Sequence, residues 1–158
     1  LNPLALADTA TERDAITTFG ATYLNSNPRR IKRLLNTYRY IKILATRQGE
    51  RTDRPDWQQK MIHWLGLTMH WPRAMGRAVR AGRLPTPDDK PYLQKLTAGL
   101  PADQCPPPEA FALSLPTPDE LPRFAALADN FIVESPRQVF APEPETSAPG
   151  VSPPAGNP

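Results

Sequence analysis

The stretch from residue 27 to residue 47 constrains the fold of this chain more than any other part of the sequence. Its apolar side chains recur at spacings of three and four residues, which places them along one face of a helix: Ile31, Leu34, Leu35, Tyr38, Ile41 and Ala45. Asn27 is a favoured N-cap residue, and Pro28 suits the first helical position. The pattern predicts a helix from Pro28 to about Arg47, with an apolar face and a cationic face.

Proline divides the remaining sequence into two parts. The 158 residues include 21 prolines, and only four of these precede residue 84. Because proline interrupts both helices and sheets, compact helices are expected mainly in the first part. The sequence therefore predicts an all-α fold, a helical bundle. It has a helical core over residues 1–83, a proline-interrupted helical extension over 84–134, and a disordered, acidic and proline-rich tail over 135–158.

Capping residues and helical spacing predict two further helices in the first part. Thr9 and Glu12 fit a capping box for a helix that ends near Leu24, in which Gly20 permits the close approach of a neighbour. Helical spacing resumes over residues 56–70. Apolar residues cover so much of that segment's circumference that we expect it to pack between other helices.

The sequence after residue 70 predicts shorter helices. One runs over residues 73–81 and ends at Gly82. Two Thr-Pro-Asp runs, at residues 86–88 and 117–119, each predict a helix start, with ends near Gly99 and Asn130. Residues 131–133 are the one strand candidate.

Charge is segregated along the chain. Residues 27–83 contain 14 Lys and Arg against 3 Asp and Glu, a net charge of +11, whereas the remaining residues carry −8. A basic middle with acidic ends indicates either a surface for a polyanion or internal pairing of the two regions. Four arginines at helical spacing predict a cationic ridge: Arg73, Arg77, Arg80 and Arg83. A small helical nucleic-acid-binding module is therefore one hypothesis.

Other features limit the compartment and the chemistry. The single cysteine, Cys105, excludes a disulfide within the chain. There is no signal-peptide pattern and no apolar run of membrane-spanning length, so we expect a cytoplasmic protein. The first residue is Leu rather than Met. We therefore expect a piece of a longer protein, in which any membrane association comes from segments outside this chain.

Histidine and tryptophan spacing offers two weaker hypotheses. His63, His70 and Cys105 match no common zinc-ligand spacing, so we expect no metal site. Trp57, Trp64 and Trp71 recur every seven residues, which is typical of a helix-packing seam. The alternative is a partner surface, which would make the chain a non-enzymatic scaffold together with its acidic tail.

The start of the predicted helix at Pro28 is the best candidate site. Helix N-termini favour anions, and Arg29, Arg30 and Arg33 add guanidinium groups suited to phosphate. The alternative is a capped helix whose basic face is merely solvated.

The run Asn27-Pro-Arg-Arg-Ile-Lys-Arg-Leu-Leu-Asn-Thr-Tyr-Arg39 resembles a signature near the C-terminal end of KAP-family P-loop NTPases, N-P-R-x-[IV]-K-R-x-x-N-x-[YF]-R. The run Trp64-Leu-Gly-Leu-Thr-Met-His-Trp-Pro72 is similar to the apolar helix that often follows it. The likeness covers roughly residues 10 to 83. It implies a helical lid that follows a nucleotide-binding core.

The resemblance also implies roles for individual residues. Arg29 corresponds to an arginine that senses nucleotide phosphate, and Arg30 and Arg33 are second choices that would otherwise pair with acids of the core. Lys32 and Arg39 are expected to serve packing or pairing. The implied partners are a nucleotide held by the core, and a protein partner or a second copy of the chain.

The resemblance implies ATP and Mg²⁺ as cofactors, bound mainly by residues outside this chain. The P-loop motif G-x-x-x-x-G-K-[ST] is absent from the sequence, and so is an apolar strand that ends in acids. Without a phosphate cradle and a metal, phosphoryl transfer lacks its main parts. We therefore expect no ATP hydrolysis by this chain alone.

Overall fold

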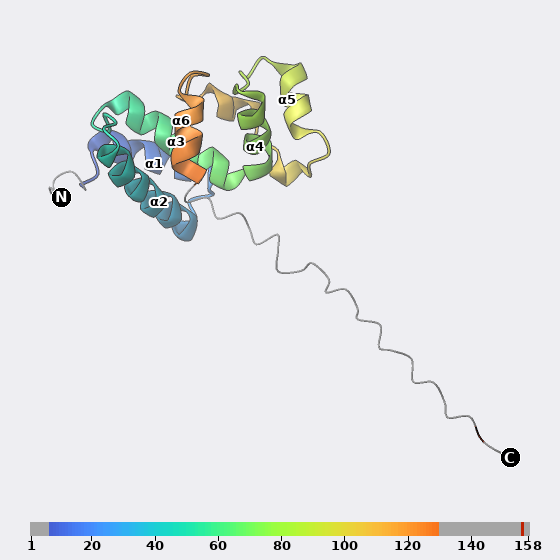
Figure 1. Cartoon of the computed structure of the whole chain (residues 1–158), viewed down its shortest axis with the longest axis horizontal. Helices are drawn as coiled ribbons and strands as arrows, with labels where there is room; N and C mark the ends of the chain where they lie inside the picture. Colours follow the sequence, from blue (N-terminus) through green and yellow to red (C-terminus); the bar gives the residue numbers. More distant parts are fainter. Residues whose placement is uncertain (1–6, 130–155, 157–158) are drawn as a thin grey trace.

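The computed structural model describes residues 7–129 and residue 156, and the regular elements of that part are all helical. The helices are α1 (Ala10–Tyr23), α2 (Pro28–Arg47), α3 (Pro55–His70), α4 (Pro72–Ala81), α5 (Lys90–Thr97) and α6 (Leu121–Asp129), with short 3-10 helices η2 (Ala102–Gln104) and η3 (Pro108–Ala112) (Figure 1). The all-α prediction is confirmed. The strand candidate at residues 131–133 and, apart from Gly156, the expected tail lie outside the described residues.

Local capping signals explain where the first helices begin. The hydroxyl of Thr9 accepts the backbone N–H of Glu12 at 3.2 Å, and the Glu12 carboxylate accepts the N–H of Thr9 at 2.6 Å. The side chain of Asn27 accepts the N–H of Arg29 at 3.0 Å, so α2 begins at Pro28 as predicted. Both starts are encoded within a few residues of sequence.

Helix α3 lies at the centre of the fold. It packs against α1, α2, α4 and α6, as its wide apolar surface predicts. The indoles of Trp57, Trp64 and Trp71 are 8%, 1% and 6% exposed, so the seven-residue repeat is a core-packing pattern. Very little of these rings is available to a partner.

Two glycines bring α1 close to its neighbours. A Cβ atom at Gly20 would lie 2.8 Å from the side chain of Ile31 in α2, which confirms the expected close approach. A Cβ atom at Gly66 in α3 would collide with the ring of Phe19. The interface of α1 with α2 and α3 therefore requires glycine, which has no side chain, at positions 20 and 66.

Residues beyond 83 contribute to the same apolar core as the first four helices. Helix α6 packs against α2, α3 and α4. Its Leu121 and Phe124 belong to one buried cluster with Leu34 of α2 and Met61 of α3. The described helices are drawn together as one body in Figure 1.

The predicted helix start at Thr86 is wrong. Helix α5 begins at Lys90, and the carboxylate of Asp89 accepts the N–H of Tyr92 at 3.4 Å as its cap. A helix that began at Pro87 would place Pro91 at its fifth position, where the ring clashes and the N–H is missing. Starting at Lys90 places Pro91 in the first turn, where an N–H has no intrahelical partner.

The second Thr-Pro-Asp run acts as a helix cap, but the regular helix begins later than the run predicts. Thr117 and Glu120 exchange the two hydrogen bonds of a capping box, at 2.9 and 3.4 Å. Regular helix nevertheless begins at Leu121, just before Pro122.

None of the described helices combines the length and apolarity needed to cross a lipid bilayer.

Candidate functional site

One side of α2 carries a shallow groove of about 440 Å³. Its lining residues are spaced three or four apart and so share one face of the helix: Arg29, Lys32, Arg33, Asn36, Thr37 and Tyr40. We call this set the α2 cationic face. Its buried counterpart, which includes Leu34, Tyr38 and Ile41, faces the core.

The cations of α2 divide into two groups. The guanidinium of Arg39 forms two hydrogen bonds with the carboxylate of Asp8, and Nζ of Lys42 lies 2.7 Å from Oε1 of Glu12. The pairing expected for Arg39 is confirmed. By contrast, Arg29, Lys32 and Arg33 are exposed, and none of them forms an ion pair within the described part of the chain.

The three arginines predicted as a set do not form one cluster. Arg29 and Arg33 line the same groove. Arg30 lies on another side of α2, where its charge acts on His70 at the end of α3. Burial first, and then the Arg30 charge, lower the pKa of His70. The structure therefore groups Arg29 and Arg33 with Lys32 rather than with Arg30.

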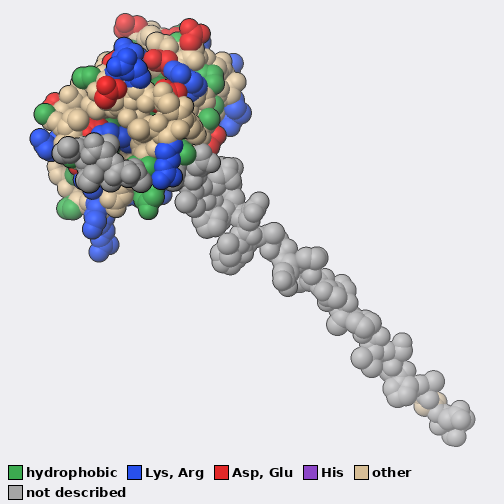
Figure 2. Space-filling view, turned by 60° about the vertical axis from the view of Figure 1, so that its left-hand side comes forward, with side chains coloured by type: hydrophobic (Ala, Val, Ile, Leu, Met, Phe, Trp, Pro, Cys, Tyr) green, Lys and Arg blue, Asp and Glu red, His purple; other side chains and the backbone are tan. Residues whose placement is uncertain are grey.

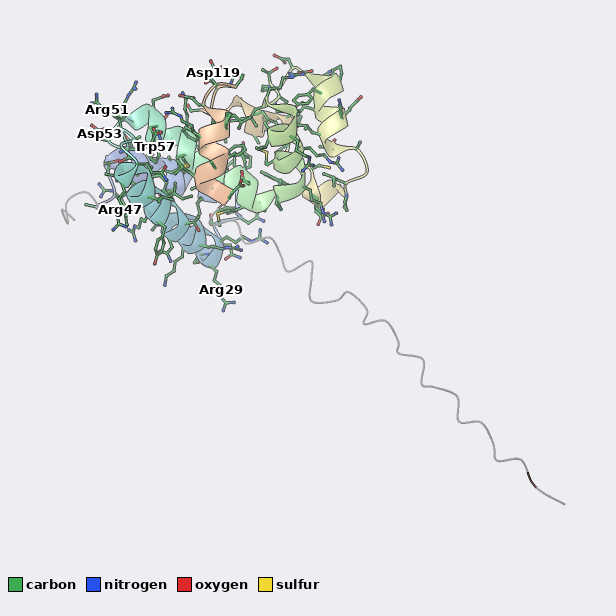
Figure 3. The ribbon with its side chains drawn as sticks, viewed as in Figure 1. Arg29, Arg47, Arg51, Asp53, Trp57 and Asp119 are labelled. Atoms are coloured by element: carbon green, nitrogen blue, oxygen red, sulfur yellow. The ribbon has the colours of Figure 1, made fainter. Side chains whose placement is uncertain are left out.

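An anion at the first turn of α2 would bind the arginine guanidinium groups rather than the backbone N–H groups. The Asn27 side chain already accepts the N–H groups of Arg29 and Arg30, at 3.0 and 3.4 Å. Figure 3 shows Arg29 at one end of α2, with its side chain directed away from the helical body. A phosphate that reaches this end would meet the Arg29 guanidinium first.

The predicted ridge on α4 is only partly available. Arg77 donates to the carbonyl oxygens of Leu96 and Ala98 at 2.9 and 2.7 Å, which caps the C-terminal end of α5. Arg83 pairs with Asp89 at 2.8 Å, and its guanidinium lies 3.9 Å from the centre of the Tyr92 ring. Two of the four arginines therefore hold α5 against α4.

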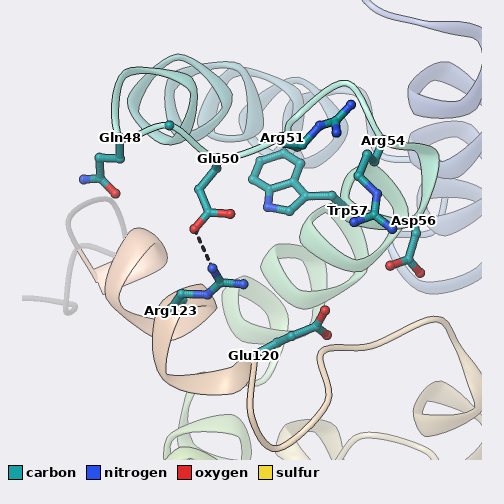
Figure 4. A pocket seen from close by; sticks show the side chains of 9 residues that line it. Gln48, Glu50, Arg51, Arg54, Asp56, Trp57, Glu120 and Arg123 are labelled. Carbon is teal, nitrogen blue, oxygen red and sulfur yellow. Dashed lines mark ion pairs between the residues drawn. The ribbon is translucent and has the colours of Figure 1, made fainter.

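The structure also reveals a pocket of about 430 Å³ that the sequence did not indicate (Figure 4). Its lining comes from the loop after α2, the start of α3 and the start of α6: Gln48, Gly49, Glu50, Arg51, Arg54, Asp56, Trp57, Glu120 and Arg123. Arg123 pairs with Glu50 at 3.0 Å, and Lys60 pairs with Asp56 and Glu120 at 3.0 Å each. Opposite charges largely neutralise one another in this pocket, so its lining does not indicate which class of ligand it would bind.

The histidines and the cysteine have structural contacts. Nδ1 of His63 lies 3.0 Å from the carbonyl oxygen of Ser114, and the His70 ring packs edge-on against Trp71 at 4.3 Å between centroids. The Cys105 thiol donates to the carbonyl of Pro101 at 3.3 Å. Across residues 7–129, no group of three or more His, Cys, Asp or Glu residues is arranged to hold a metal ion.

Comparison with known proteins identifies no relative: no family model, no curated protein and no solved structure matches the chain. Over residues 7–129 the fold is an all-α unit in which α2 carries a cationic face.

Proposed function

We propose that this chain is the helical lid of a KAP-like P-loop NTPase, and that Arg29 contacts the phosphates of a nucleotide held by residues outside the chain. One observation carries the proposal: the cations of α2 divide by role. Arg39 and Lys42 pair with acids of the α1 region, whereas Arg29 and Arg33 remain exposed on one face without a described acidic partner. That division leaves guanidinium groups for an external anion.

The surroundings of α2 suit a sensing role. Glu12 and Asp8 tie the middle of α2 to α1, while Leu34 and Ile41 are at most 1% exposed in the core. A rigidly held helix transmits a displacement of its first turn to the elements packed against it. Contact between Arg29 and a γ-phosphate would therefore couple the nucleotide state to the position of the whole lid, and through it to a protein partner or a second copy.

The described residues fit contact with phosphate but not the binding of Mg²⁺. Arg29 and Arg33 are suited to a phosphate group, whereas the described carboxylates form no cluster that could hold a metal ion. On this proposal the P-loop and the Mg²⁺ ligands belong to a core domain encoded upstream, and the assembled protein acts in the cytoplasm. The chain alone binds no Mg²⁺–ATP tightly and hydrolyses none.

The coding sequence upstream of Leu1 tests this proposal first. We expect a P-loop motif followed by a strand that ends in acidic residues, within a few hundred codons. A gene whose upstream region encodes neither would contradict the assignment to P-loop NTPases. ATP turnover by the full-length protein then tests the role of Arg29 itself, as described at the end of the Discussion.

A further inference from the structure

The α2 cationic face contains an aromatic side chain as well as cations. Tyr40 is 64% exposed, the highest exposure of any large hydrophobic residue in the described part of the chain. It lines the same groove as Lys32 and Arg33. A tyrosine ring combines apolar area with a π-face, so its place beside cations on this face adds a group on which a planar ligand can stack.

Charge on this face is of one sign. All the charged residues that line the groove are cationic, namely Arg29, Lys32 and Arg33. The polar residues between them, Asn36 and Thr37, carry no charge and supply hydrogen-bonding groups. In Figure 1 helix α2 forms the lower edge of the helical body, and Figure 2 shows Lys and Arg side chains reaching that edge while most Asp and Glu lie higher.

We propose that the α2 cationic face binds single-stranded nucleic acid, with Arg29, Lys32 and Arg33 on the phosphates and Tyr40 stacked against a base. Proteins that bind single strands combine a positively charged groove with exposed aromatic rings. A duplex keeps its bases stacked and offers no ring face to Tyr40, so single strands are the preferred form. The ridge on α4 is a poorer candidate because Arg77 and Arg83 already bind α5 and Asp89.

This inference goes beyond the proposed lid function and is tested separately. Arg29 belongs to both sites, but Tyr40 lies eleven residues further along α2, about 16 Å away along a helix axis. A change at Tyr40 therefore reports on strand binding, whereas ATP turnover reports on Arg29.

The test uses fluorescence anisotropy with the whole chain and a labelled oligothymidylate of about 20 nucleotides, with a duplex of the same length for comparison. Three phosphate contacts on a single strand predict a slope of log K against log salt of about −2. Affinity then falls about 20-fold between about 50 and 200 mM salt. The duplex binds more weakly at every salt concentration.

Variants assign the binding to particular residues. Tyr40→Ala should weaken strand binding about 5- to 150-fold without changing the salt slope, while Tyr40→Phe keeps the affinity. Lys32→Ala should reduce the magnitude of the slope by about 0.7. Arg80→Ala is the matched control, since it removes an exposed cation from α4 and should leave binding nearly unchanged.

Three outcomes would overturn the proposal. The first is no binding of the oligothymidylate at about 50 mM salt. The second is an unchanged affinity of a folded Tyr40→Ala variant, or a loss of affinity for Arg80→Ala as large as that for Lys32→Ala. Either result would show that binding depends on overall positive charge rather than on the α2 cationic face. The third is that the face binds polyglutamate but not the oligonucleotide, which identifies it as a surface for an acidic protein.

Discussion

Tyr38 of α2 donates a hydrogen bond to the carboxylate of Glu12 in the first turn of α1, and both residues are 0% exposed. Burial first, and then this hydrogen bond, raise the pKa of Tyr38 far above its usual value, so the phenol stays protonated as the donor. The same carboxylate accepts the N–H of Thr9 and pairs with Nζ of Lys42. Glu12 therefore caps α1 and also fixes α2 beside it.

Glu12→Ala is expected to lower the free energy of unfolding by about 3–5 kcal/mol, the usual cost of removing one partner from a buried ion pair. The substitution leaves the buried hydroxyl of Tyr38 and the ammonium of Lys42, 11% exposed, without the carboxylate. Urea unfolding followed by circular dichroism measures the change. A loss below about 1 kcal/mol would show that the pair adds no more than a surface ion pair does.

Asp53→Ala provides the matched control for Glu12. Its pair with Arg51 spans 3.8 Å, and the two side chains are 74% and 77% exposed. Exposed pairs contribute about 0–1 kcal/mol, so this variant should unfold almost like the original protein.

Gly66→Ala should destabilise the fold by about 1–3 kcal/mol, because the added methyl group overpacks the contact between α3 and the Phe19 ring. Gly76→Ala in α4 should instead stabilise by about 0.5–1 kcal/mol, since alanine favours helix and the added Cβ meets only the Arg80 side chain, at 3.6 Å. Thermal unfolding of the two variants measures both effects. Equal shifts in the same direction would contradict the close packing at Gly66.

Stability should decrease as the pH falls from about 7.5 to about 5.5. Burial lowers the pKa of His63, and burial together with the Arg30 charge lowers the pKa of His70. The unfolded chain takes up protons near the ordinary histidine pKa of about 6.5, while the folded chain takes them up only at lower pH. The free energy of unfolding is thus fully retained above that pKa, and it declines as the pH falls towards the folded-state values.

Urea unfolding at three pH values across that window measures this dependence. A double variant, His63→Gln with His70→Gln, should be less stable overall, because both rings pack on aromatic neighbours. Its stability should nevertheless vary less with pH. A wild-type stability that stays constant or increases towards pH 5.5 would be incompatible with the lowered histidine pKa values.

Features set by neighbouring residues could be predicted from the sequence. Asn27 and Pro28 define the start of α2 because the cap and the first turn lie within a few residues of each other. The local cap at Thr86 predicts too early a start for α5, because Pro91 disfavours a helix that begins at Pro87. The buried tryptophans followed from their periodicity in the same way.

Features set by contacts between distant segments could not be predicted. The spacing of four residues places Arg29 and Arg33 on one face of α2. Only the packing of the α1 region against α2 shows that Arg39 forms an ion pair with Asp8. The pocket beside Trp57 depends on how α6 docks, which brings Arg123 to Glu50. The exposure of Tyr40 likewise depends on which face of α2 the other helices cover.

ATP turnover by the full-length protein, with and without Arg29, tests the central claim most directly. Arg29→Ala should reduce turnover at least about tenfold, because an arginine that contacts the transferred phosphoryl group contributes heavily to its transition state. Arg47→Ala, an exposed arginine at the other end of the same helix, is the matched control and should retain full turnover. Equal turnover by the Arg29→Ala variant, the Arg47→Ala variant and the original protein would contradict the assignment of α2 as a phosphate-sensing lid helix.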